Sequence, residues 1–128
     1  MNLTTFIGRK NPLSREFIEL PQFHKKWNEL GLDEESLRML QIQLLKNPQA
    51  GDVVTGTGGL RKYRFRLPNR GKSGGARVLY VDFVAYEKIY LLTAYSKSNK
   101  ENLSTTECQE IRKMIHKLEE VLRRGVNK

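Results

Sequence analysis

Four cationic side chains in the middle of the chain have the types and the spacing to handle a phosphodiester. Lys62, Arg64 and Arg66 alternate with apolar residues, which is the period of a β-strand with one face in the core. On such a strand their side chains stand roughly 6.6–7 Å apart, close to the spacing of successive phosphates in an extended nucleic-acid strand. Arg77 begins the next predicted strand and is placed to join them. The pattern predicts a cationic strand face that binds a nucleic-acid backbone.

Such a cluster could also support RNA cleavage without a metal ion. When a 2′-hydroxyl attacks the neighbouring phosphorus, the pentacoordinate transition state carries extra negative charge, which positioned cations stabilise. The planar fork of an arginine suits the equatorial oxygens, and a lysine among arginines is a candidate for the base. The residues alone leave open a simpler interpretation, a phosphate-binding surface with no chemistry.

The net charge of the chain is concentrated in the same segment. The 128 residues include 23 Lys and Arg and 14 Asp and Glu, which gives +9 and a pI near 9.9. Residues 53–81 contain seven basic and no acidic residues, so 29 residues hold +7 of this charge. The basic residues are interleaved with aromatic and aliphatic ones, which indicates a folded segment rather than a charged tail. The composition favours a polyanionic partner.

Other site motifs are incomplete in this sequence. Gly71-Lys-Ser73 lacks the earlier glycine that a phosphate-binding loop needs, because Arg66 stands there. The glycines of Gly56–Gly59 are not followed by a helical pattern, as a dinucleotide fingerprint requires. Two isolated histidines and the single Cys108 cannot supply a structural zinc site. We therefore expect neither a cofactor nor a metal ion.

The apolar patterning predicts the elements that position these cations. A short strand is expected at Phe17–Leu20. Helical stripes over Phe23–Leu30 and from the N-cap Asp33 to Asn47 predict a helical hairpin. A capping box at Ser104–Glu107 starts a C-terminal helix that closes at Gly125.

Between these helices the period changes to that of β-strands. Arg61–Leu67, Ala76–Val84 and Ile89–Tyr95 are expected as three antiparallel strands in meander order, with a glycine-rich link at Pro68–Gly75. The fold class is thus α+β, a small antiparallel sheet with an N-terminal helical hairpin and a C-terminal helix.

The length predicts one domain, over residues 17–128, with an N-terminal extension at residues 1–16. No apolar run approaches the ~20 residues of a membrane span, and residues 1–15 lack the apolar core of a signal peptide. We therefore expect a cytoplasmic protein with no membrane partner.

Three stretches around the predicted strands carry a family resemblance. They are Asn47–Lys62 (NPQAGDVVTGTGGLRK), Arg70–Val78 (RGKSGGARV), and Tyr90–Lys97 (YLLTAYSK) with Lys100–Leu103 (KENL). They resemble the RelE/ParE toxin superfamily, in its HigB-like branch, and the similarity runs from about Phe17 to Leu122. The resemblance implies the RelE fold, a small curved antiparallel sheet with helices packed on one side.

The resemblance also implies roles for individual cations. Lys62 and Arg64 fall where RelE-like toxins place phosphate-contacting and acid/base residues, and Arg77 falls at the transition-state arginine. Lys97 matches a basic position at the end of the last strand. These four are the candidate catalytic residues, and the further candidates for RNA binding are Arg61, Arg66, Arg70, Lys72 and Lys100.

One feature of this chain departs from the family pattern. Some relatives have a tyrosine or histidine in the C-terminal segment that stacks on the base or transfers a proton. Residues Lys97–Ser104 contain neither, and Tyr95 lies one strand position early. The sequence therefore does not assign the general base.

The function implied by the resemblance is a bacterial toxin that cleaves mRNA in the ribosomal A site, in contact with ribosomal RNA. A cognate antitoxin, expected to be of helix-turn-helix type, would silence it. Two alternatives stay open: a ParE-like inhibitor of DNA gyrase, which would lack the basic strand cluster, and a nucleic-acid-binding module with no catalysis.

Overall fold

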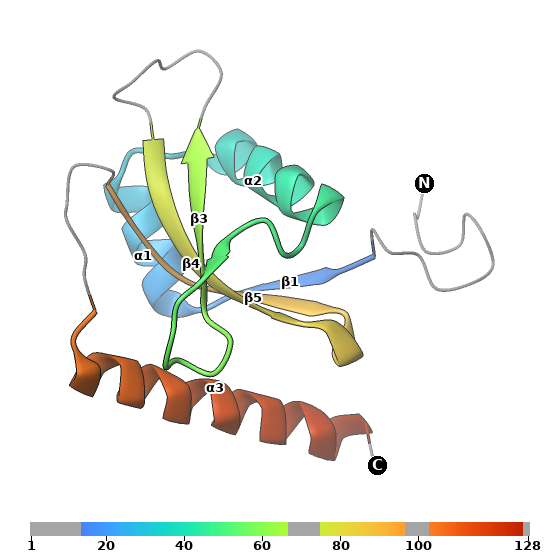
Figure 1. Cartoon of the computed structure of the whole chain (residues 1–128). Helices are drawn as coiled ribbons and strands as arrows, with labels where there is room; N and C mark the ends of the chain where they lie inside the picture. The colour runs from blue at the N-terminus through green and yellow to red at the C-terminus, as the bar shows by residue number, and fades with distance from the viewer. Residues whose placement is uncertain (1–13, 67–74, 97–102, 127–128) are drawn as a thin grey trace.

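The structure is a computed structural model that describes residues 14–66, 75–96 and 103–126. In chain order the elements are β1 (Glu16–Glu19), α1 (Pro21–Glu29), α2 (Glu34–Lys46), β2 (Asp52–Val53), β3 (Arg61–Arg66), β4 (Gly75–Phe83), the 3₁₀ turn η2 (Val84–Tyr86), β5 (Lys88–Ser96) and α3 (Thr105–Val126). The expected α+β class, the helical hairpin and the C-terminal helix are all present (Figure 1).

A five-stranded sheet forms the centre of the molecule, in the order β1-β5-β4-β3-β2. The expected antiparallel meander is confirmed as β3-β4-β5. Two short strands extend it, because β2 pairs antiparallel with β3 and β1 pairs parallel with β5. The sheet is therefore mixed, whereas the sequence led us to expect an antiparallel one, since a four-residue segment gives no sign of its pairing partner.

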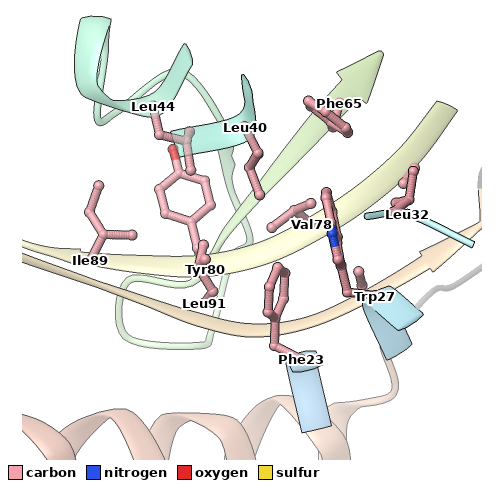
Figure 2. Close-up of a cluster of buried hydrophobic side chains, with 12 residues drawn as sticks. Phe23, Trp27, Leu32, Leu40, Leu44, Phe65, Val78, Tyr80, Ile89 and Leu91 are labelled. Atoms are coloured by element: carbon pink, nitrogen blue, oxygen red, sulfur yellow. The ribbon is translucent and has the colours of Figure 1, made fainter. Parts of the chain in front are cut away.

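Helices cover both faces of this sheet, so the expectation of helices on one side is wrong. The apolar stripes of α1 and α2 pack on one face, around Phe23, Trp27, Leu40 and Leu44, as Figure 2 shows. The stripe of α3, centred on Ile115, packs on the opposite face. The two sets separate because successive strand residues point to opposite faces.

The first residues of each helix show why it starts where it does. Pro21 occupies the first turn of α1, where its missing N–H costs no hydrogen bond. Asp33 caps α2 by accepting the Ser36 N–H at 2.8 Å. The capping box of α3 is confirmed. The Ser104 N–H donates to Glu107 Oε1 at 2.9 Å, and the Glu107 N–H donates to Ser104 Oγ at 3.1 Å.

A buried ion pair ties the residue before β1 to the sheet. Arg15 Nε donates to Asp82 Oδ1 at 2.7 Å and Arg15 Nη2 donates to Oδ2 at 3.1 Å. The two side chains are 8% and 1% exposed. Arg15 and Glu16 thus contact the sheet although they fall within the expected extension of residues 1–16. Residues 1–13 of that extension lie outside the described residues.

Within the described ranges, none of the helices has the length and apolar character that a membrane crossing requires.

Candidate nucleic-acid interface

Four of the predicted cations share one face of the sheet, here called the cationic face: Lys62, Arg64, Arg66 and Arg77. Arg64 on β3 pairs directly with Arg77 on β4, and Lys62 pairs with Leu79. Leu79 belongs to the hydrophobic cluster under α3, so the cationic face lies on the α3 side of the sheet. Arg66 ends β3 at the end that points away from α3 in Figure 1. The structure therefore places on one face the three residues that the alternation predicted, together with Arg77 from the next strand.

No carboxylate neutralises this face among the residues that the structure describes. Its four cations take part in no ion pair there, including Lys62, whose direct partner on β2 is Asp52. Arg64 and Arg66 are exposed, while Lys62 and Arg77 are half-buried. Two like charges lie directly opposite each other at Arg64 and Arg77, an arrangement that destabilises a bare sheet. An anion bound between them would remove that penalty.

Arg77 differs from the other members of this face in having a buried nitrogen without a hydrogen-bond partner among the described residues. Its Nη1 is the one buried side-chain nitrogen or oxygen without a hydrogen-bond partner among the described residues. A buried polar group in that state costs about 1–3 kcal/mol and more when it is charged. A phosphate oxygen would satisfy the guanidinium through a charge-assisted hydrogen bond.

A close contact between the α2–β2 loop and β3 fixes the backbone at Lys62. The Gly51 N–H donates to Tyr80 Oη at 2.9 Å, and this hydroxyl donates to the carbonyl oxygen of Pro48 at 2.8 Å. A β-carbon at Gly51 would lie 2.8 Å from Tyr80 Cε1 and 2.9 Å from the Lys62 carbonyl oxygen. Glycine is therefore required sterically at residue 51.

A buried threonine holds the loop between β2 and β3. Thr57 Oγ1 donates to the carbonyl oxygen of Val54 at 2.6 Å and accepts the Leu60 N–H at 3.0 Å. Thr57 and Leu60 are both 0% exposed. The glycines that resembled a dinucleotide fingerprint flank this threonine, and Gly56, Gly58 and Gly59 all have positive φ. Their place is in a packed turn that leads into the cationic strand.

Arg61 lies apart from the other predicted RNA contacts. It pairs with Tyr80, whose side chain belongs to the core under α1 and α2, so Arg61 projects from the opposite face. Its Nη1 donates to the carbonyl oxygens of Gln49 and Gly51 at 3.1 and 2.8 Å. Alternation already separates residue 61 from residues 62, 64 and 66, and the guanidinium is engaged in holding the α2–β2 loop. Four further candidates, Arg70, Lys72, Lys97 and Lys100, lie outside the described residues.

A β-bulge brings Tyr95 to the cationic face. The register between β4 and β5 shifts between Leu79 and Tyr80, where β5 accommodates Leu92 as an extra residue. Beyond the bulge Tyr95 pairs directly with Arg77, so both side chains lie on one face. Strict alternation along β5 would have turned Tyr95 toward α1. The sequence carries no signal for this bulge, so alternation alone could not place Tyr95 on the cationic face.

Two tyrosines on the other face, the half-buried Tyr63 and the buried Tyr80, have raised pKa values. Burial raises the pKa of Tyr63, whose hydroxyl donates to Gln43 Oε1 at 2.5 Å. Burial also raises the pKa of Tyr80, and the hydrogen bond from Gly51 and the charge of Arg61 offset part of this rise. Both phenols lie on the opposite side of the sheet from the cationic face, so they are structural groups.

The fold and the site together define a class: a small α+β protein whose sheet has, among the described residues, a cationic face without ion pairs. Comparison with known proteins makes this more specific. A family model described as the RelE toxin of the RelE / RelB toxin-antitoxin system matches residues 22–128. The chain belongs to the RelE toxin family and is thus a toxin of a toxin–antitoxin system.

A solved structure supports the fold independently. The free-state structure of a double arginine-to-alanine mutant of the E. coli toxin RelE is similar to this chain, with a TM-score of 0.50 and 15% sequence identity. The match covers 66% of this chain and 85% of that one. The expected RelE fold is therefore confirmed, and assignment to the HigB-like branch stays a prediction.

Proposed function

We propose that this toxin is an mRNA endonuclease that acts in the ribosomal A site and cleaves RNA without a metal ion. The observation that supports the proposal most directly is Arg77, whose buried Nη1 has no partner among the described residues and whose neighbours on the cationic face are unpaired cations. Membership of the RelE toxin family supplies the biological setting. The same family supports action on mRNA at the ribosome, in contact with ribosomal RNA.

The proposed reaction is an internal transfer at phosphorus. The 2′-oxygen forms a bond to the adjacent phosphorus, and the bond from phosphorus to the 5′-oxygen of the next nucleotide breaks. A base takes the 2′-hydroxyl proton, and an acid gives a proton to the leaving 5′-oxygen. The products are a 2′,3′-cyclic phosphate and a 5′-hydroxyl end. No redox partner and no metal-bound water are needed for this balance.

The cations of the site have separate roles in this scheme. Arg77 stabilises the charge that develops on the equatorial oxygens, because its Nη1 is already buried and has no hydrogen-bond partner among the described residues to give up. Arg64 and Arg66, which are exposed along β3, bind the scissile phosphate and its neighbour. Lys62 and Lys97 are the candidates for the two proton transfers.

An antitoxin is the second proposed partner. An acidic antitoxin segment lying on the cationic face would compete with RNA for the same four side chains, so inhibition and substrate binding would use one surface. We propose that this antitoxin is of the helix-turn-helix type and that the toxin acts in the cytoplasm.

Replacement of Arg77 by alanine tests the catalytic role. The matched control is Arg38→Ala, because Arg38 is an exposed arginine on α2, on the other side of the sheet. Each variant is induced in cells, and translation and mRNA 5′ ends are measured. Loss of one positioned cation from the transition state is expected to lower the cleavage rate about 10²- to 10³-fold, while the control stays at the wild-type level. Equal growth arrest and equal cleavage by wild type and Arg77→Ala would refute the catalytic assignment.

The same experiment separates the alternatives. Intact transcripts together with gyrase-linked DNA damage would identify a ParE-like gyrase inhibitor. Absence of growth arrest, with RNA binding that weakens uniformly as salt increases, would identify a binding module with no catalysis.

A further inference from the structure

Beside the cationic face lies a hollow that shares Lys62 with that face and has no other role in the proposed reaction. Its described lining residues are Val54, Thr55, Lys62, Leu79, Tyr95, Leu103 and Cys108, and its volume is about 280 Å³. We call it the Leu79 hollow. We propose that the Leu79 hollow receives a nucleobase of the RNA beside the scissile phosphate and that its walls determine which base is cleaved. This inference rests on the proposed function and adds a specificity site to it.

The position of the hollow is the first argument. Lys62 belongs both to the cationic face and to the lining of the hollow. Tyr95, another lining residue, pairs directly with Arg77. Directly paired side chains in a sheet lie about 4.5–5.5 Å apart at their β-carbons. A nucleotide whose phosphate lies against Arg77 and Lys62 therefore has its base within reach of the hollow.

The chemistry of the walls is the second argument. Leu79, Val54 and Leu103 provide apolar surface for the flat faces of a base, and Leu79 is only 7% exposed. The Lys62 ammonium and the Thr55 hydroxyl provide hydrogen-bonding groups. No carboxylate belongs to the described lining, so nothing there repels the attached phosphates. The volume lies just below the range of about 300–1,000 Å³ typical of pockets for drug-sized ligands, which suits a single base.

The polar groups also favour one kind of base edge. An ammonium donates hydrogen bonds and accepts none, so Lys62 suits a carbonyl oxygen and is poorly matched to an exocyclic amine. Guanine presents two acceptors, O6 and N7, whereas adenine presents an amine beside N7. We therefore expect the hollow to prefer guanine over adenine.

Cys108 offers a direct test of occupancy, because it is the single cysteine of the chain and lines the hollow in a half-buried state. The wild-type protein is alkylated with iodoacetamide in the presence of uncleavable 2′-deoxyguanosine 3′,5′-bisphosphate. At a concentration about ten times the Kd, the alkylation rate is expected to fall about tenfold, since only the empty hollow reacts. The adenine analogue should protect less, and the abasic sugar bisphosphate should not protect. Equal alkylation rates in the presence of the guanine, adenine and abasic compounds would overturn the proposal. Protection by the abasic compound as strong as that by the guanine compound would overturn it as well.

A pair of variants tests the role of the hollow in base selection. Thr55→Val removes one hydroxyl from the lining, and Thr106→Val makes the same change at an exposed position on α3 outside it. Loss of one hydrogen bond is expected to change the ratio of cleaved bases about 2- to 10-fold in Thr55→Val. The Thr106→Val variant should keep the wild-type ratio. The readout is the base composition at mRNA 5′ ends mapped by sequencing.

Failure of this inference can be told from failure of the proposed function. If the wild-type protein cleaves no mRNA but a base protects Cys108, the endonuclease function is refuted and base binding in the Leu79 hollow is supported. If the wild-type protein cleaves mRNA, but no base protects Cys108 and Thr55→Val leaves the base ratio unchanged, base binding in the Leu79 hollow is refuted. The endonuclease function is then supported.

Discussion

Replacement of Tyr80 by phenylalanine tests how the α2–β2 loop is held against the cationic strand. The Tyr80 side chain is 0% exposed, and its hydroxyl both accepts the Gly51 N–H at 2.9 Å and donates to the Pro48 carbonyl at 2.8 Å. Phenylalanine keeps the ring and its packing but removes both hydrogen bonds. The change thus isolates the contribution of one oxygen atom.

The size of the effect follows from the burial of the groups left without a partner. Gly51 is buried, so its N–H would lose its acceptor without access to water, at a cost of about 1–3 kcal/mol. Pro48 is half-buried, so water can replace part of the bond to its carbonyl oxygen. We expect Tyr80→Phe to lower the free energy of unfolding by about 2–3 kcal/mol.

Urea unfolding of the purified protein measures this difference, and an unchanged m-value shows that the loss is one of stability. The matched control is Tyr63→Phe, since the Tyr63 hydroxyl makes a single hydrogen bond, to Gln43, in a half-buried position. The control should lose only about 0.5–1.5 kcal/mol. A loss in Tyr80→Phe no larger than in Tyr63→Phe would refute the argument that the buried Gly51 N–H depends on this hydroxyl.

Three further predictions concern packing, the buried ion pair and alkaline pH. Gly51→Ala places a β-carbon within 2.9 Å of the Lys62 carbonyl oxygen, so thermal unfolding should show a loss of about 1–3 kcal/mol, whereas Gly125→Ala, where nothing lies within 4 Å, should show none. Arg15→Ala leaves Asp82 buried without its cation and should cost about 3–5 kcal/mol in urea, and a cost under 1 kcal/mol would show that residue 15 is not part of the folded unit. The raised pKa of Tyr63 means that the folded state holds the phenol proton more tightly than the unfolded state. This contribution is complete below pH 10 and is lost as pH rises through the folded pKa, so stability should fall less steeply above pH 10 in Tyr63→Phe than in wild type.

The helices and the three-stranded meander were predictable because their signals are local. The capping box at Ser104 and Glu107, the N-cap at Asp33 and the alternation of β3 each depend on residues within a few positions of one another. The same alternation predicted that Lys62, Arg64 and Arg66 share a face. The alternation of apolar and charged residues is sufficient to predict this strand and the face that its cations share.

The pairings that depend on distant residues were not predictable. β1 joins the sheet beside β5, about 70 residues later in the chain, and Arg15 finds Asp82 across a similar separation. A four-residue strand and a lone arginine contain no information about partners that far away. The same limit applies to the side of the sheet that α3 covers, because its apolar stripe fits either face.

The bulge in β5 is another feature that the sequence did not predict, and it changes which residues lie at the proposed site. One inserted residue reverses the facing of everything beyond it, so Tyr95 leaves the core side and pairs with Arg77 on the cationic side. On the core side, two stacked rings, Phe23 and Trp27, fill the space between α1 and the sheet. The face under α1 and α2 is mostly apolar along β3, whereas the α3 face combines a hydrophobic cluster with like charges that a core would not tolerate. The repulsion between Arg64 and Arg77 is tolerated because the opposite face is well packed, and the phosphate that we propose to bind between them would remove it.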